Sequence, residues 1–232
     1  MTDGILIVDK EKGWTSHDVC AFIKKRFHIQ KVGHAGTLDP LATGVLVVLL
    51  GRATRLFDSM AACDKEYLGT MQLGIQTNSH DIEGKIIAER DWKNVTEEGL
   101  ERVVEKFRGD IVQKPPMVSA LKHKGVRLYK LARQGKEIDR PSRPITVHKL
   151  EVRDIRFPFI DFFAHVSKGT YLRTLAHDIG EMLGSFAVLS DLRRLRCGEF
   201  GLEDAVSIAA LKQMSTPELG RLIRMSTAAL RA

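Results

Sequence analysis

The chain has 232 residues, of which 44% are hydrophobic and 28% charged, so it is long and apolar enough to form a sizeable core. It carries 36 Lys and Arg against 29 Asp and Glu, and the net charge of +7 favours a polyanionic partner. No apolar run reaches membrane-spanning length, and the N-terminal run at 5–8 ends at Asp9-Lys10 without the pattern of a signal peptide.

Three cysteines, Cys20, Cys63 and Cys197, are spread along the chain. Their odd number and the lack of a C-x-x-C pair favour neither a disulfide framework nor a zinc site. Free thiols are typical of the reducing cytosol, so we expect a cytoplasmic protein.

In chain order, the first expected element is a buried strand at 4–8, which is an apolar run. Thr15 or Ser16 can cap a helix whose apolar residues follow at helical spacing, namely Val19, Phe22, Ile23 and Phe27. A glycine-rich loop at 33–44 then leads into an apolar run at 45–50, which predicts a second buried strand.

The later elements follow from the same patterns. They are a strand at 66–74, a helix after Thr96 that stops at Gly109, a loop-rich segment at 112–144 with a short helix near 126–134, a strand pair at 145–156 and 159–167, a helix from Leu172 to Gly184, and a helical tail at 205–232. Strands and helices mix without strict alternation, which predicts an α/β or α+β fold with a mixed sheet flanked by helices. Without linkers or repeats, residues 1–232 are expected to form a single domain.

The run from Gly33 to Gly44 places one acid, Asp39, among small and apolar residues. Pro40 disfavours the α region at Asp39, and three glycines permit close backbone approach. A carboxylate oriented beside a core strand is costly unless it has a partner or a task. Ordinary turn chemistry is the alternative, because Asp-Pro pairs are common in turns.

Six segments of the chain resemble the TruB family of tRNA pseudouridine synthases. They are Gly33-His34-x-Gly36-x-Leu38-Asp39-Pro40-x-Ala42-x-Gly44, Lys65-Glu66-Tyr67, Pro116-Met117-x-Ser119-Ala120-Leu121-Lys122, Arg143-Pro144-Ile145, Ser167-Lys168-Gly169-Thr170-Tyr171-Leu172-Arg173-Thr174 and Leu192-Arg193-Arg194-Leu195. The resemblance implies a central mixed, largely antiparallel sheet. It also implies isomerisation of uridine 55 in the TΨC arm of tRNA, a reaction that needs no metal and no cofactor.

The resemblance implies that Asp39 is the essential acid and that Arg173 is its partner. A guanidinium remains charged and can bind a carboxylate through two hydrogen bonds. The alternative places Arg173 on an exposed helix face, where it would contact phosphate together with Lys168.

By the same resemblance, Tyr67, Tyr171 and Leu192 surround the target base, and Tyr67 takes part in proton transfer. From periodicity alone, Tyr67 is a core residue beside Met71, Tyr171 is plain packing, and Leu192 lies on a helix face. The resemblance places His34 against the RNA, where it supports base flipping. A metal role for His34 is not favoured, because no second ligand stands at a suitable spacing, and His80-Asp81 is too isolated to supply one.

The basic charge is concentrated at 122–144, where eight basic and two acidic residues account for +6 of the net +7. We expect Lys124, Arg127 and Lys130 to contact phosphates, although a solvated face is the alternative. The resemblance implies an insertion here, at about 112–144, that closes over the RNA. Bacterial members of the family usually have a C-terminal PUA domain, and the residues after the last motif are too few for one.

The expected partner is therefore the T stem-loop of tRNA, with no membrane or protein partner, and the expected state is a monomer. Two other functions remain open at this point. One is a pseudouridine synthase of different RNA specificity, and the other is an RNA-binding protein that assists tRNA folding.

Overall fold

The computed structural model describes residues 3–119, 121–123, 125–136 and 138–224. The chain divides into two compact units, Met1–Tyr67 with Arg193–Ala232 (unit 1) and Leu68–Leu192 (unit 2). It passes between them within the two strands β4 (Lys65–Leu73) and β12 (Ala187–Cys197). The expectation of a single domain therefore stays a prediction.

Unit 1 is built on the strand order β14-β1-β3-β12, with β2 also paired to β3 and β13 to β12. Its elements are β1 (Gly4–Lys10), α1 (Ser16–Arg26), β2 (Val32–Ala35), β3 (Thr43–Leu50), η1 (Gly51–Leu56), α2 (Phe57–Ala61), the start of β4, the end of β12, β13 (Phe200–Gly201), η2 (Leu202–Asp204), β14 (Val206–Ser207), α6 (Ile208–Gln213) and α7 (Thr216–Leu222). β1 and β3 pair antiparallel, and their apolar side chains form the core with Cys197 and Phe200.

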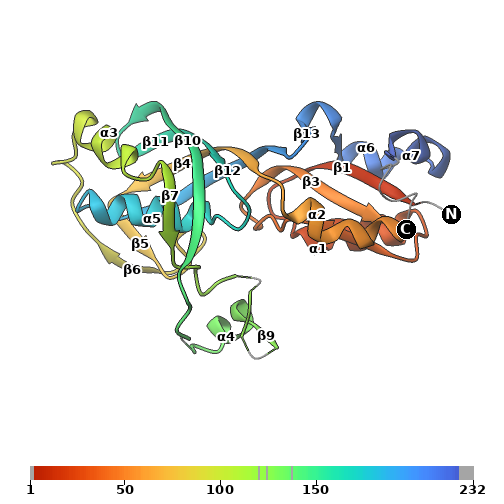
Figure 1. The fold of residues 1–232 in the computed structure, drawn as a ribbon, viewed down its shortest axis with the longest axis horizontal. Helices are drawn as coiled ribbons and strands as arrows, with labels where there is room; N and C mark the ends of the chain where they lie inside the picture. The colour runs from red at the N-terminus through yellow and green to blue at the C-terminus, as the bar shows by residue number, and fades with distance from the viewer. Residues whose placement is uncertain (1–2, 120, 124, 137, 225–232) are drawn as a thin grey trace. The chain divides into compact units, whose positions relative to one another are not determined.

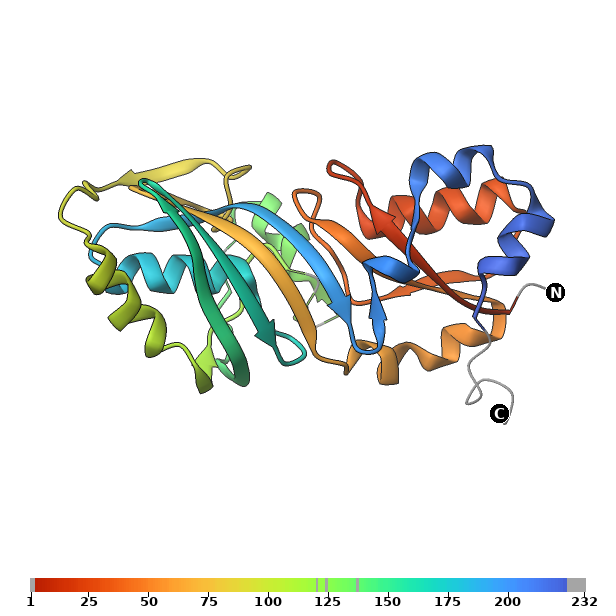
Figure 2. The same ribbon diagram turned by 90° about the horizontal axis from the view of Figure 1, so that it is seen from above.

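Unit 2 contains the strand order β12-β4-β11-β10-β7. Its elements are most of β4, β5 (Ile75–Thr77), β6 (Ile86–Glu89), α3 (Glu97–Glu105), β7 (Gly109–Gln113), β8 (Lys122–His123), β9 (Val126–Arg127), α4 (Leu128–Arg133), β10 (Arg143–Arg156), β11 (Phe159–Val166), α5 (Leu172–Met182) and the start of β12. α3 contacts both α5 and β10 (Figure 2). The segment with β9 and α4 projects from the sheet of unit 2 (Figure 1).

The expected mixed α/β fold is confirmed: the sheet combines antiparallel pairs, such as β10 with β11, and the parallel pair β3 with β12. The expected strand at 4–8 and the helix capped by Thr15 are also confirmed. Thr15 accepts from the Asp18 N–H at 3.0 Å, and the Asp18 carboxylate accepts from the Thr15 N–H at 2.9 Å. This reciprocal capping box sets the start of α1. Within the described residues, no helix is long and apolar enough to cross a membrane.

Several expected boundaries are wrong. The helix after Thr96 ends at Glu105, and Gly109, at φ +81°, instead begins β7. The glycine-rich run is a loop only at 36–42, because its first residues pair in β2 and Gly44 lies in β3. The strand β12 was not expected, because charged residues interrupt its apolar pattern. The expected helical tail contains α6 and α7, and its last residues, 225–232, lie outside the described part.

Candidate active site

Asp39 lies in the loop between β2 and β3 of unit 1, and the residues on both sides of it are anchored. The Ser16 hydroxyl accepts from the Leu38 N–H at 2.8 Å and donates to the Leu38 carbonyl at 3.1 Å. The Pro40 carbonyl accepts from the Gly13 N–H at 2.9 Å. Asp39 itself is only partly buried. The loop therefore presents this carboxylate from a backbone that is fixed from two directions.

Lys10 adds a buried cation beneath the same loop. Its side chain is fully buried, and its Nζ donates to the carbonyls of Trp14 at 2.7 Å, Glu11 at 3.0 Å and Pro40 at 3.5 Å. A buried ammonium needs such acceptors, because desolvation without them is costly. Lys10 thus joins the end of β1 to the residue that follows Asp39.

Arg194 anchors the glycine-rich run from the other side. This side chain of β12 is 1% exposed, and it donates from Nε to the Val45 carbonyl at 2.6 Å and from Nη2 to the Gly36 carbonyl at 3.0 Å. Gly44, at φ +98°, pairs with Arg194, and a Cβ at this glycine would lie 2.1 Å from the Arg194 carbonyl oxygen. Glycine is therefore required where the loop enters β3.

Tyr67 is buried on β4, close enough to Asp39 and Arg194 for their charges to act on its hydroxyl. Burial raises the pKa of Tyr67, the charge and hydrogen bond of Arg194 lower it, and the negative charge of Asp39 raises it. The net shift is upward, so the phenol is neutral at physiological pH. Unit 1 thus brings together an acid, a neutral phenol and a buried guanidinium.

Arg194 was not predicted as a site residue, although it lies in the motif Leu192-Arg193-Arg194-Leu195. The signal was the pair Arg193-Arg194 in a strand, where successive side chains point to opposite faces. Arg193 is half exposed and donates to the Asp9 carboxylate at 2.8 Å, while Arg194 is buried.

His34 lies in β2, opposite Val48 of β3, and is partly buried. The expectation that it lies in the loop is wrong, because β2 continues to Ala35 before the loop begins. Its contact with RNA stays a prediction.

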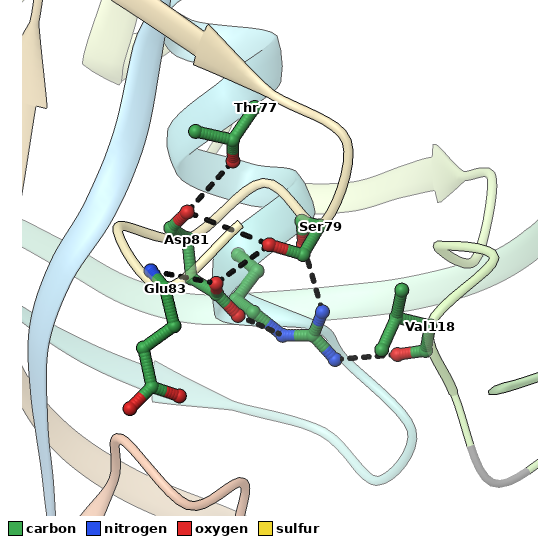
Figure 3. A network of polar contacts seen from close by, with 6 residues as sticks. Thr77, Ser79, Asp81, Glu83 and Val118 are labelled. Carbon is green, nitrogen blue, oxygen red and sulfur yellow. Dashed lines mark hydrogen bonds and ion pairs between the residues drawn. The ribbon is translucent and has the colours of Figure 1, made fainter. Parts of the chain in front are cut away.

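Arg173 lies in the first turn of α5, in unit 2, and is only 2% exposed. Its Nη1 donates to the Ser79 carbonyl and its Nη2 to the Val118 carbonyl, both at 2.8 Å. Its Nε lies 3.7 Å from Oδ2 of Asp81 (Figure 3). The alternative that Arg173 lies on an exposed helix face is therefore wrong.

Asp81, which was set aside as a metal ligand, is the acid that pairs with Arg173 in this part of the chain. It is buried, and its Oδ1 accepts from the Ser79 hydroxyl at 2.6 Å and from the Glu83 N–H at 3.2 Å (Figure 3). Its carbonyl accepts from the Thr77 hydroxyl at 2.7 Å. The turn chemistry of Ser79 and Asp81 was visible in the sequence, but the partner, Arg173, is about ninety residues away.

Tyr171 directly precedes α5, and its main chain is held by the buried side chain of Gln113. The Gln113 amide accepts from the Tyr171 N–H at 2.8 Å and donates to the Tyr171 carbonyl at 3.1 Å. The Arg143 guanidinium lies 5.1 Å from the centre of the Tyr171 ring. The ring is thus held from its backbone and one face, while the residue is only partly buried.

Leu192 is buried at the point where β12 leaves unit 2. The alternative of a helix-face leucine is wrong, because residues 187–197 form a strand. Asp39, Tyr67 and His34 belong to unit 1, whereas Arg173, Tyr171 and Leu192 belong to unit 2. Their grouping around one base stays a prediction.

Of the three expected phosphate contacts, Arg127 lies in β9 and Lys130 in α4. Lys124 lies outside the described residues. The short helix expected near 126–134 is confirmed as α4. Contact with RNA by these three residues stays a prediction.

A mixed sheet with an acid on a glycine-rich loop is the arrangement expected for the catalytic domain of a pseudouridine synthase. The profile of the TruB family pseudouridylate synthase N-terminal domain matches residues 24–172, and that of the tRNA pseudouridylate synthase B C-terminal domain matches residues 173–230. The chain belongs to the TruB family.

Curated relatives agree with this assignment. The tRNA pseudouridine synthase B of Syntrophotalea carbinolica is 47% identical over 99% of this chain and 75% of its own length. That of Opitutus terrae is 42% identical over 98% of this chain and 95% of its own length.

Among solved structures, the chain is similar to one in a Cbf5-Nop10-Gar1 complex, with 31% identity and a TM-score of 0.74. A second match, at 29% identity and a TM-score of 0.69, is an H/ACA RNP bound to a substrate RNA containing 2'-deoxyuridine. Each match covers 96% of this chain, which spans only 60% and 58% of those two chains.

Proposed function

We propose that this protein converts uridine to pseudouridine at position 55 in the TΨC arm of tRNA. Membership of the TruB family and relatives named tRNA pseudouridine synthase B support uridine isomerisation in tRNA. The observation that carries the proposal is Asp39, presented by a loop whose anchors are its neighbours Leu38 and Pro40. These anchors fix the backbone from which the Asp39 side chain extends.

The reaction breaks the N1–C1′ bond of uridine, rotates the uracil and forms a C5–C1′ bond. The proton lost from C5 balances the one gained at N1, so uridine and pseudouridine are isomers and no net redox change occurs. Asp39 supplies the carboxylate, as nucleophile or as stabiliser of a charged intermediate. Tyr67, whose phenol is neutral, supplies a flat surface for the base and an O–H that can exchange protons.

We assign Arg173 as the counter-charge of Asp39. A guanidinium has five N–H donors, and the contacts with Ser79, Val118 and Asp81 involve three of its nitrogens. These contacts hold the plane of the guanidinium. Because Asp39 and Arg173 belong to different units, we propose that residues 1–232 act as one catalytic domain.

Base flipping must precede the chemistry, because C1′ and C5 of a stacked uridine are out of reach. We propose that Tyr171 and Leu192 receive the flipped base with Tyr67, and that His34 supports the opened loop. Lys124, Arg127 and Lys130 bind phosphates and offset the cost of unstacking, which is a few kcal/mol. With tRNA as substrate, the protein acts in the cytoplasm, and we expect a monomer.

The test is incubation of the purified protein with an unmodified tRNA transcript, followed by mapping of pseudouridine at single-nucleotide resolution. We expect one pseudouridine, at position 55, and none in a matched transcript that carries cytidine there. Modification of another uridine would support a pseudouridine synthase but contradict the assignment to position 55. RNA binding without any pseudouridine would overturn the enzyme and favour the tRNA-folding role.

A further inference from the structure

The turn at residues 77–84, here called the Asp81 turn, bears two acceptors that orient Arg173. These are the Ser79 carbonyl and the Asp81 carboxylate. The residue between them, His80, has a φ of +64°. The left-handed region is unfavourable for residues with a Cβ and is the usual place for glycine. Histidine adopts this region more often than most residues, and unlike glycine it carries a ring that can pack.

The His80 ring lies on the ring of His177, with ring centres 4.0 Å apart and planes inclined by 16°. His177 is on α5, four residues after Arg173, so the two side chains leave the same face of the helix. The Asp81 turn therefore meets α5 at two places, at the guanidinium and at the stacked rings.

The stacked rings are both neutral at physiological pH. Burial lowers the pKa of His80 to about 3, with His177, Arg173 and Arg140 acting in the same direction. Burial also lowers the pKa of His177, although Glu181 opposes the shift. Two neutral imidazoles can stack in the low-dielectric interior without charge repulsion.

Backbone contacts on the other side of His80 hold the same turn against β12. The Leu189 N–H donates to the His80 carbonyl at 3.1 Å, and the Ile82 N–H donates to the Leu189 carbonyl at 2.9 Å. These bonds hold the turn to the sheet, whereas the ring stack sets its position along α5. Arg173 is thus sensitive to any shift of the turn relative to α5.

We propose that His80 and His177 are positioning residues that set the orientation of Arg173 toward the reacting nucleoside. The pair acts through the Asp81 turn and does not touch the substrate. This inference rests on the proposed function, because it requires Arg173 to act in the reaction.

The main test is His80→Gly in the full-length protein, assayed for kcat and KM on tRNA. Glycine suits the backbone at φ +64°, so the variant folds and keeps its melting temperature within a few degrees. We expect kcat to fall about ten- to a hundredfold, with little change in KM, because small misplacement of a catalytic group has effects of this size. His177→Ala should behave alike, and His177→Phe, which keeps a flat ring, should recover most of the rate.

A second measurement separates positioning from a general effect on the fold. In an Arg173→Lys background, measured by single turnover with the enzyme in excess, His80→Gly should cost nothing further, since the two changes remove the same function. His17→Ala, at an exposed position of α1, is the matched control and should change nothing.

Three outcomes would overturn the inference: an unchanged kcat in His80→Gly, a rise in KM alone, or an equal loss in the Arg173→Lys background. These outcomes are distinct from failure of the proposed function, which would appear as a wild-type protein that forms no pseudouridine. If the wild type and His80→Gly were equally active, the proposed function would stand and only the positioning role of His80 would be contradicted.

Discussion

Asp39 and Asp81 are both single acids in turns, but they differ in burial and in how their turns are held. Asp81 is buried, and its two carboxylate oxygens meet a hydroxyl, a backbone N–H and a guanidinium. Asp39 is partly buried, and its loop is anchored through Leu38 and Pro40. Asp81 thus takes part directly in holding Arg173, whereas the backbone on both sides of Asp39 is held by contacts of its neighbours.

The substitution Asp39→Asn tests the catalytic role of Asp39 most directly, because it keeps the size of the side chain and removes its charge. We expect pseudouridine formation to fall by at least about a thousandfold, as for loss of a central catalytic group. The melting temperature should stay close to that of the wild type, because Ser16, Gly13 and Lys10 still hold the loop. Rates are measured by single turnover on unmodified tRNA. If Asp39→Asn retained a tenth of the wild-type rate, Asp39 would not be the essential acid.

Asp81→Asn, unlike Asp39→Asn, should lower the stability of the fold. The amide can keep the hydrogen bonds of the turn, but Arg173 then becomes a buried charge without this partner. Removing one member of a buried ion pair costs about 3–5 kcal/mol, so the free energy of unfolding should drop by about this amount. Urea denaturation measures it, with Asp154→Asn, at an exposed position on β10, as the control. A wild-type stability for Asp81→Asn would mean that the pair contributes nothing to the fold.

Substitutions in the basic segment at 122–144 should affect tRNA binding and not the chemical step. Arg127→Ala and Lys130→Ala should each weaken tRNA binding and reduce the slope of log K against log salt by about one unit. Neither should change kcat at saturating tRNA, unlike Asp39→Asn. Lys24→Ala, at an exposed position of α1, is the matched control. Unchanged slopes would identify the segment as a solvated face.

Substitution of a third acid, Asp178 of α5, should have the smallest effect, a change in the free energy of unfolding that depends on pH. Burial, with a further contribution from Glu181, raises the pKa of Asp178 from 3.8 to about 6. The folded state therefore holds this proton more tightly than the unfolded state, and stability falls as the pH rises from about 4 to 6. Asp178→Asn should increase the free energy of unfolding at pH 8, by less than about 2 kcal/mol after solvent screening, and leave it unchanged at pH 4. An equal effect of Asp178→Asn at both pH values would contradict the raised pKa of Asp178.

Most local structure could be predicted because its causes lie within a few residues. Thr15 and Asp18 cap α1 across three residues, and the alternation of Tyr67, Met71 and Leu73 reports one buried face of β4. The strand β12 was missed, because its buried arginine contradicts the usual apolar pattern of a buried strand.

The amino-acid sequence by itself determined the family and the mixed fold, since motifs and periodicity are properties of adjacent residues. Only the tertiary structure decided that Arg173 is buried against the Asp81 turn, that Arg194 acts on the Tyr67 hydroxyl, and that His80 stacks on His177. The physical reason is that a buried charge or ring takes its partners from segments far apart in the chain, which no local pattern specifies.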